Sequence, residues 1–169
     1  MPNEMPVKPK DRDMKIRPAV LSDSLLLSSL CTDVQRLHAE HHPEIFKMPQ
    51  SDDFAVAFFG EMIADPTTRI FIAEEGDDAI GYIFCKSFER PEGPFTYTNR
   101  FIQIEHISVR PEAQRHSVGT ALMNRVEELA REIGVTKIQL DSWGFNINAH
   151  IFFERLGFEK FDFRFWRKP

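Results

Sequence analysis

The chain has 169 residues and a formal net charge of −5, with 42% hydrophobic and 28% charged residues. This length fits one domain, and the composition excludes a disordered chain. No apolar run approaches the roughly 20 residues that a membrane span needs, so we expect no membrane partner. The acidic balance argues against nonspecific binding of nucleic acid. Cys31 and Cys85 have no partner at metal-site or redox spacing, and we expect both in the core.

The first thirteen residues are polar, carry prolines and lack the apolar stretch of a signal peptide. The remaining residues show no internal repeat and no sign of a second domain. We therefore expect a flexible N-terminal tail over residues 1–13, a single domain over residues 14–169, and a cytoplasmic protein.

Helical and strand patterns alternate along the rest of the chain. In chain order, we expect a strand at 14–18, a helix capped by Ser22-Asp23 and ended by Pro43, a helix from Ser51 to about Asp65, strands at 69–74 and 80–88 joined by Gly76-Asp77-Asp78, a strand at 100–109, a helix that stops at Gly134, a strand at 136–141, a helix at 148–156 and a strand at 158–166. The segment 89–99 is expected to be a loop that shapes a substrate mouth. This order predicts an α/β protein with antiparallel hairpins early and a β-α-β crossover late.

The turn over residues 114–119 opens a long amphipathic helix, directly after the strand at 100–109. Its sequence is Gln114-Arg115-His116-Ser117-Val118-Gly119. The unpaired N–H groups of a first helical turn, together with the positive end of the helix dipole, bind phosphate without a dedicated lysine. We therefore expect a pyrophosphate site at this turn.

Two ordered motifs resemble those of the GNAT superfamily of acyl-CoA-dependent N-acyltransferases. The first consists of Val109-Arg110-Pro111, the 114–119 loop and Ala121-Leu122. The second consists of Trp143, Phe145-Asn146, Ala149, Phe152-Phe153 and Gly157-Phe158. The resemblance implies a mixed, mostly antiparallel sheet flanked by helices, with acetyl-CoA as cosubstrate and no metal.

The resemblance also implies which residues hold the cofactor. The strand backbone around Ile107 and Val109 binds the pantetheine arm in family members, and an N–H group near Ile107 polarises the thioester oxygen. The cofactor-binding residues expected on this basis are Ile107, Ser108, Val109, Gln114, Arg115, His116, Ser117, Val118, Gly119, Thr120, Asn146 and Phe153. A turn before a helix is the alternative role for Asn146.

Two positions depart from the family pattern. Ser117 stands where the loop usually has its first glycine, and we expect modest weakening of cofactor binding rather than loss. Phe153 stands where many members have a tyrosine that acts as general acid, and it has no proton to give. A thiolate, with a reference pKa of about 8.5 for its thiol, leaves tolerably without an acid, so a base matters more.

Glu105 is the base that we expect. By strand alternation it shares one face with Gln103, Ile107 and Val109, and several family members place an acidic residue there. In a half-buried cleft its pKa would rise toward neutrality; the alternative is an ordinary charge at a strand end. If a substitute acid is needed, Tyr97 is the better candidate, with His106 and His150 as others.

The expected activity is transfer of an acetyl group from acetyl-CoA to a primary amine, by direct attack in a ternary complex. A small-molecule acceptor such as a polyamine, an aminoglycoside or an amino acid derivative is favoured, and Glu40 with Glu44 would help to hold its charge. The alternatives are a protein Nα- or Nε-acetyltransferase and a CoA-binding module without turnover. We expect a homodimer, as is common in the superfamily. The C-terminal aromatic residues are expected to pack as a strand, and one of their faces is a candidate dimer contact. His38 and His41 do not have the spacing of a zinc motif.

Overall fold

A computed structural model describes residues 13–169 of the chain. The chain divides into two compact units, one ending at Gln139 and the other Leu140–Pro169. The strands are β1 (Met14–Pro18), β2 (Thr68–Glu75), β3 (Asp78–Arg90), β4 (Asn99–Val109) and β5 (Ile138–Leu140). The α-helices are α1 (Ser24–His41), α2 (Val56–Ala64), α3 (Val118–Glu132) and α4 (Ile147–Arg155), and short 3-10 turns cover Leu21–Asp23 and Pro111–Ala113.

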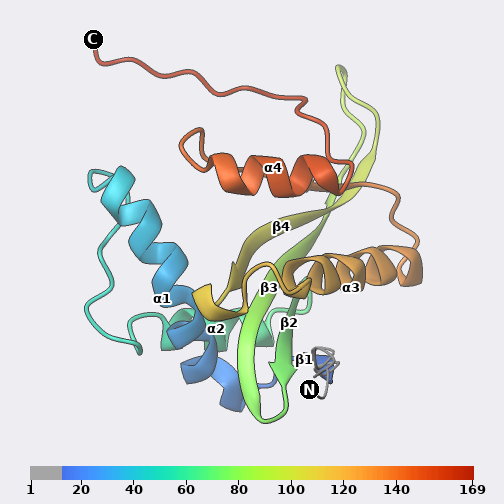
Figure 1. Ribbon diagram of the computed structural model, residues 1–169. Helices are drawn as coiled ribbons and strands as arrows, with labels where there is room; N and C mark the ends of the chain where they lie inside the picture. Colours follow the sequence, from blue (N-terminus) through green and yellow to red (C-terminus); the bar gives the residue numbers. More distant parts are fainter. Residues whose placement is uncertain (1–12) are drawn as a thin grey trace, which may run out of the picture. The chain divides into compact units, whose positions relative to one another are not determined.

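The five strands form one sheet in the order β1-β2-β3-β4-β5. The first four strands are antiparallel neighbours. Helix α3 connects β4 to β5 across one face, which makes the last pair parallel and the sheet mixed. The predicted α/β class with a mixed, mostly antiparallel sheet is confirmed, as Figure 1 shows.

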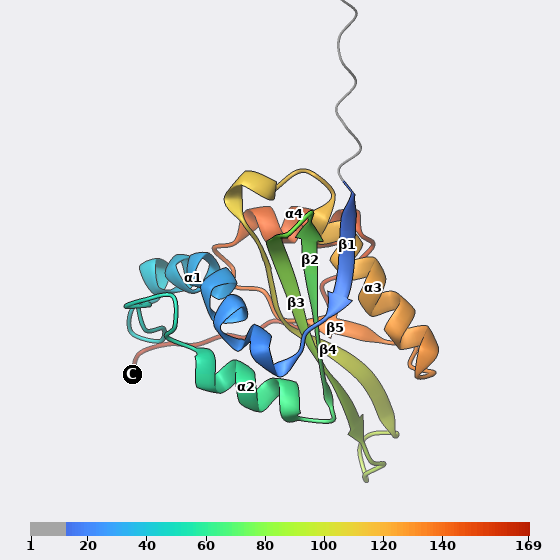
Figure 2. The same cartoon turned by 90° about the horizontal axis from the view of Figure 1, so that it is seen from below.

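Helices cover both faces of the sheet (Figure 2). Helices α1 and α2 pack on one face, where the buried cluster consists of Leu27, Leu30, Cys31, Phe59, Ile70, Ile72, Tyr82 and Phe84. On the other face α3 buries Leu122, Met123, Val126 and Leu129. Both cysteines are buried and free, as expected. Among the described residues no helix is long and apolar enough to cross a membrane.

Helix α1 begins directly after Asp23, as the predicted cap Ser22-Asp23 indicates, whereas α2 begins later than the sequence suggests. The Asp23 carboxylate accepts the N–H of Val20 at 2.8 Å and an ion pair from Arg17 at 2.7 Å, so a 3-10 turn precedes α1. Ser51 does not cap α2, because its hydroxyl bonds the Asp53 side chain and residues 51–55 form turns. The prediction that α2 begins at Ser51 is therefore wrong by about one turn.

Strand β4 contains a bulge at Glu105. On β3, Cys85 pairs with Ile104 and its neighbour Phe84 pairs with His106, so the register between β3 and β4 skips Glu105. An extra residue shifts the alternation of side chains from that point onward. Gln103 therefore faces the opposite side of the sheet from Ile107 and Val109, and the prediction that they share a face is wrong.

The second unit consists of α4 and the segment after it. Asn146 caps the helix, because its side-chain oxygen accepts the N–H of Ala149 at 3.3 Å. Phe153 is buried against the rings of Phe152 and Phe158, at centroid distances of 5.3 and 5.8 Å.

The predicted strand at 158–166 is wrong, because residues 158–169 have no regular structure. Alternating aromatic residues give this segment the composition of a strand, but a strand also needs a neighbouring backbone with which to pair. The side chains of Phe161, Phe163, Phe165 and Trp166 are exposed.

Candidate functional site

The turn before α3 has an anion-binding backbone. Arg115 and Ser117 both have positive φ, at 65° and 63°, and Ser117 is the N-cap residue of the helix. A left-handed residue followed by a helical one aims successive N–H groups into the same concavity. The N–H groups of Val118, Gly119 and Thr120 have no carbonyl one turn earlier to bond, as at any helix start. These groups suit an anion, and the pyrophosphate site expected at this turn stays a prediction.

The turn is fixed to the end of β4. The Gln114 side-chain amide donates to the Val109 carbonyl at 3.1 Å. Ala113 donates its N–H to the Arg110 carbonyl at 2.9 Å and is itself buried, as is Val118 at the start of the helix. These contacts hold the concavity beside the last residues of the strand, while Arg115 and His116 remain exposed.

The bulge also decides which edge of β4 each peptide group faces. The N–H of Ile102 donates to the carbonyl of Lys137, which directly precedes β5, at 2.9 Å. The N–H of Arg110 donates to the carbonyl of Ile80 in β3, also at 2.9 Å. Residues 102 and 110 are an even number apart, so unbroken alternation would turn both toward the same strand. The bulge at Glu105 inverts the alternation, which is why the N–H groups of Ile102 and Arg110 point to different strands.

Alternation from Arg110 then turns the N–H groups of Ile107 and Val109 toward the β5 edge. Strand β5 has three residues, and the chain just before it bonds to β4 at Ile102, upstream of the bulge. The backbone of Ile107 and Val109 is thus directed to the edge at which the resemblance places a pantetheine arm.

Gly81 permits close pairing of β3 with this part of β4. A side chain there would place its Cβ 2.7 Å from the Ser108 carbonyl oxygen and 3.3 Å from the Cα of Val109. Ser108 is buried, and its hydroxyl donates to the Leu30 carbonyl at 2.9 Å, which ties β4 to α1. The structure therefore gives the Ser108 side chain a packing role, and the cofactor contact expected at Ser108 stays a prediction.

The two expected catalytic side chains lie apart. Glu105 is exposed at the bulge, not half-buried in a cleft. Tyr97 is 87% exposed in the 91–98 loop, beyond the start of β4 at Asn99. The six residues from Asn99 to Glu105 span about 20 Å of strand. The structure does not bring Tyr97 to the bulge.

His106 directly follows Glu105 and packs among aromatic rings. Its Nδ1 lies 3.2 Å from the hydroxyl of buried Tyr82, and the rings of Phe58 and Phe84 pack against it at 6.3 and 5.5 Å. Burial, and then the nearby His38, lower the pKa of His106 to about 4, while burial raises the pKa of Tyr82 well above its usual range. The imidazole is therefore neutral and the phenol protonated at neutral pH. Sequence reasoning considered His106 only as a substitute acid, because the bulge that directs it toward α1 and α2 leaves no signal in the sequence.

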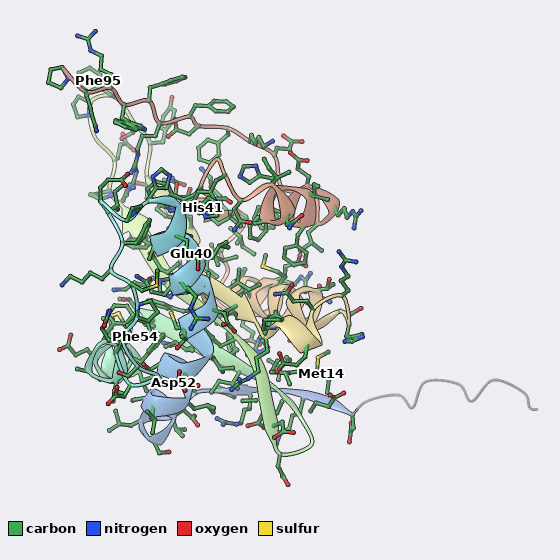
Figure 3. All side chains as sticks on the ribbon, turned by 60° about the vertical axis from the view of Figure 1, so that its left-hand side comes forward. Met14, Glu40, His41, Asp52, Phe54 and Phe95 are labelled. Atoms are coloured by element: carbon green, nitrogen blue, oxygen red, sulfur yellow. The ribbon has the colours of Figure 1, made fainter. Side chains whose placement is uncertain are left out.

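The histidines at the end of α1 use their ring nitrogens within the helix. Nδ1 of His38 lies 2.6 Å from the Val34 carbonyl, and Nδ1 of His41 lies 2.9 Å from the Leu37 carbonyl. No group of three or more candidate metal ligands occurs among residues 13–169. Glu40 and His41 mark the last turn of the helix in Figure 3.

In the second unit the residues expected at the cofactor have roles within the unit itself. Asn146 caps α4, which is the alternative role that the sequence left open for it. Phe153 is buried in the aromatic cluster described above, and its contact with the cofactor stays a prediction. Of the substitute acids, His150 lies on α4, where its Nε2 is 3.0 Å from the Trp143 carbonyl.

Replacing Ser117 by glycine is expected to stabilise the protein. The left-handed backbone costs a residue with a Cβ atom about 1 kcal/mol, which glycine avoids. We expect S117G to raise the free energy of unfolding by about 0.5–1 kcal/mol in urea denaturation. The matched change S29G, inside α1, should lower it by a similar amount. A loss of stability in S117G would contradict the assigned backbone conformation.

The buried neutral state of His106 is expected to make stability depend on pH. Between pH 6.5 and 4 the unfolded chain binds a proton at this residue and the folded chain does not, so stability falls as the pH is lowered through that window. From pH 7.5 to 5 the loss from His106 should be about 1–2 kcal/mol. H106N, whose amide preserves a polar contact with Tyr82, should lose that much less than the parent in urea denaturation at the two pH values. Equal losses in the two proteins would show that His106 protonates normally when folded.

Comparison with known proteins agrees with this architecture. A family model described as the acetyltransferase (GNAT) family matches residues 31–158. A four-site mutant of the BH1408 protein from Bacillus halodurans has a similar structure, with a TM-score of 0.85 and 18% identity over 92% of this chain and 99% of that chain.

Two aminoglycoside acetyltransferases also share the fold. AAC(6')-Iy, solved with the bisubstrate analog CoA-S-monomethyl-acetylneamine, has a TM-score of 0.71 and 20% identity over 92% of this chain and 98% of that chain. AAC(6')-Ih from Acinetobacter baumannii, an aminoglycoside 6'-N-acetyltransferase, has a TM-score of 0.69 and 22% identity over 92% and 97%. The structures share the fold, and the family model spans well over half of the sequence. The chain therefore belongs to the GNAT family of N-acetyltransferases.

Proposed function

We propose that the protein transfers the acetyl group of acetyl-CoA to a primary amine of a small molecule, in a ternary complex. The observation that carries this proposal is that two backbone features, a helix N-terminus and a strand edge, follow each other along the chain. The concavity at Ser117–Thr120 follows the edge at Ile107 and Val109 directly along the chain, and Gln114 ties one to the other. The pyrophosphate would bind at the concavity and the pantetheine arm along the edge.

The same edge supports the acyl-transfer step. The neutral amine attacks the thioester carbon, the carbonyl oxygen becomes an oxyanion, and the C–S bond then breaks to release the CoA thiolate. A backbone N–H aimed at the developing oxyanion stabilises it without reorganisation, and that of Ile107 is directed to the edge where the thioester would lie. The proton lost by the amine nitrogen balances the one that the thiolate finally takes up.

Glu105 is the proposed base. It stands at the bulge, two residues before Ile107, and its exposure suits removal of the amine proton through a bound water. An acid is less necessary, because the thiolate is stable enough to leave unprotonated. Tyr97 has no part in this proposal, since the strand length separates it from the bulge.

The preference for a small-molecule acceptor draws on the fold neighbours. The solved structures of similar fold include several aminoglycoside acetyltransferases, two of them named above. At about 20% identity these structures share the fold with this chain. A small-molecule acceptor is therefore part of the proposal.

Removing the Glu105 carboxylate is expected to slow turnover without weakening cofactor binding. We expect E105Q to lower kcat about 10- to 100-fold at neutral pH, with KM for acetyl-CoA unchanged within about twofold, because water must then take the proton unaided. Release of CoA thiol with a panel of primary amines measures both quantities. The matched variant E89Q removes an exposed carboxylate at the far end of β3 and should keep full activity.

Calorimetry with acetyl-CoA separates the remaining outcomes. Tight binding without thiol release from any amine would replace the proposal with a CoA-binding module. Full activity in E105Q would leave acetyl transfer in place and remove Glu105 as its base.

A further inference from the structure

Residues 106–109 of β4, which follow the bulge, lie between β3 and the proposed site of the pantetheine arm. Strand β3 pairs with them through residues 81–84. The opposite edge is the one that the cofactor is proposed to occupy, so a further strand cannot support it there. A bulge also disrupts the ladder and bends the strand that carries it. The peptide group of Ile107 therefore depends on contacts other than strand pairing to keep a fixed direction.

The side chains before and after Ile107 are both anchored on the face of the sheet that α1 and α2 cover. The hydroxyl of Ser108 donates to the Leu30 carbonyl of α1 at 2.9 Å. Nδ1 of His106 lies 3.2 Å from the hydroxyl of Tyr82 in β3. Ser108 and Tyr82 are buried. The peptide group of Ile107 thus lies between two side chains that are held by different elements.

The bond from Ser108 fixes the position of β4 relative to α1. Leu30 lies inside this helix, where a carbonyl already accepts the N–H four residues later. The carbonyl therefore does not need Ser108, whereas the buried hydroxyl needs an acceptor. The hydroxyl reaches this acceptor only when the strand lies at one position along the helix. The bond thus specifies a position more than it satisfies the backbone of α1.

The residues that follow Ser108 are anchored independently of it. The Gln114 side chain donates to the Val109 carbonyl at 3.1 Å. Arg110 donates its N–H and its Nε to carbonyls of β3, at 2.9 and 3.0 Å. Loss of the Ser108 bond should therefore displace Ile107 more than Val109.

We propose that Ser108 is a positioning residue for acetyl transfer, and that it holds the N–H of Ile107 where the thioester oxygen becomes negatively charged. This inference rests on the proposed acetyl transfer and adds to it a residue that acts through the backbone. An N–H group that stabilises an oxyanion must keep its distance and direction to the oxygen. A small displacement therefore lowers the rate of the chemical step more than it lowers cofactor affinity.

Removal of the hydroxyl should separate turnover from cofactor binding. Thiol release with acetyl-CoA is measured over a broad panel of primary amines that includes spermidine, kanamycin and 2-phenylethylamine. With the best amine, we expect S108A to lower kcat about 5- to 20-fold, while the Kd of acetyl-CoA from calorimetry changes less than about twofold. An unchanged kcat overturns the assignment and leaves acetyl transfer intact. A Kd that weakens as much as kcat falls also overturns it, because Ser108 would then serve cofactor binding.

An isosteric pair of variants separates the hydroxyl from its packing. S108T and S108V add the same volume, and only S108T keeps a hydroxyl that can reach Leu30. We expect S108T to keep kcat within about threefold of the parent and S108V to lose as much as S108A. Equal kcat in S108T and S108V would overturn the assignment. Absence of thiol release from the parent with every amine would overturn acetyl transfer, and the assignment with it.

A second serine on α1 supplies the control for loss of stability. The hydroxyl of Ser28 is buried and accepts the N–H of Ala55, at the start of α2, at 3.0 Å. S28A leaves that N–H unpaired, so its midpoint of urea unfolding should fall at least as far as that of S108A. Its kcat should stay within about twofold of the parent. An equal loss of kcat in S28A and S108A would overturn the assignment, because reduced stability alone would then slow turnover.

Discussion

One extra residue in β4 is the constraint on which the rest of the site depends. Without the bulge at Glu105, the peptide groups of Ile107 and Val109 would point toward β3 and bond to it. No N–H group of these two residues would then face the opposite edge. With it, they turn toward that edge. The same shift turns the imidazole of His106 toward α1 and α2. A single backbone irregularity thus directs the peptide groups of Ile107 and Val109 to one edge of β4 and the imidazole of His106 to one face of the sheet.

The turn before α3 is held by backbone geometry, and the surroundings of His106 are held by side-chain packing. At the turn, the left-handed residues Arg115 and Ser117 cost conformational free energy, which the contacts of Gln114 and the adjacent buried residues offset. Around His106, burial and then the nearby His38 lower the pKa and keep the imidazole neutral. The first arrangement tolerates a change of side chain, as Ser117 in place of glycine illustrates. The second depends on side-chain identity.

The sequence predicts regular elements better than it predicts the geometry of the site. Strand β1, the hairpin turn at Gly76 and the stop of α3 at Gly134 follow from local patterns and are confirmed. The bulge is invisible locally, because an extra residue in a strand changes pairing and leaves composition unaltered, so strict alternation misplaced Gln103. The expected strand at 158–166 failed for the converse reason, since its composition suits a strand but its backbone has no neighbour in its unit.

Amide hydrogen exchange with and without acetyl-CoA tests the central claim most directly, because it reads the individual peptide groups of β4. The account predicts that saturating acetyl-CoA slows exchange at Ile107 and Val109 at least tenfold, while Arg110, already bonded to Ile80, changes little. Saturable binding that leaves Ile107 and Val109 unprotected would contradict the account, because the edge created by the bulge would then not be the cofactor site.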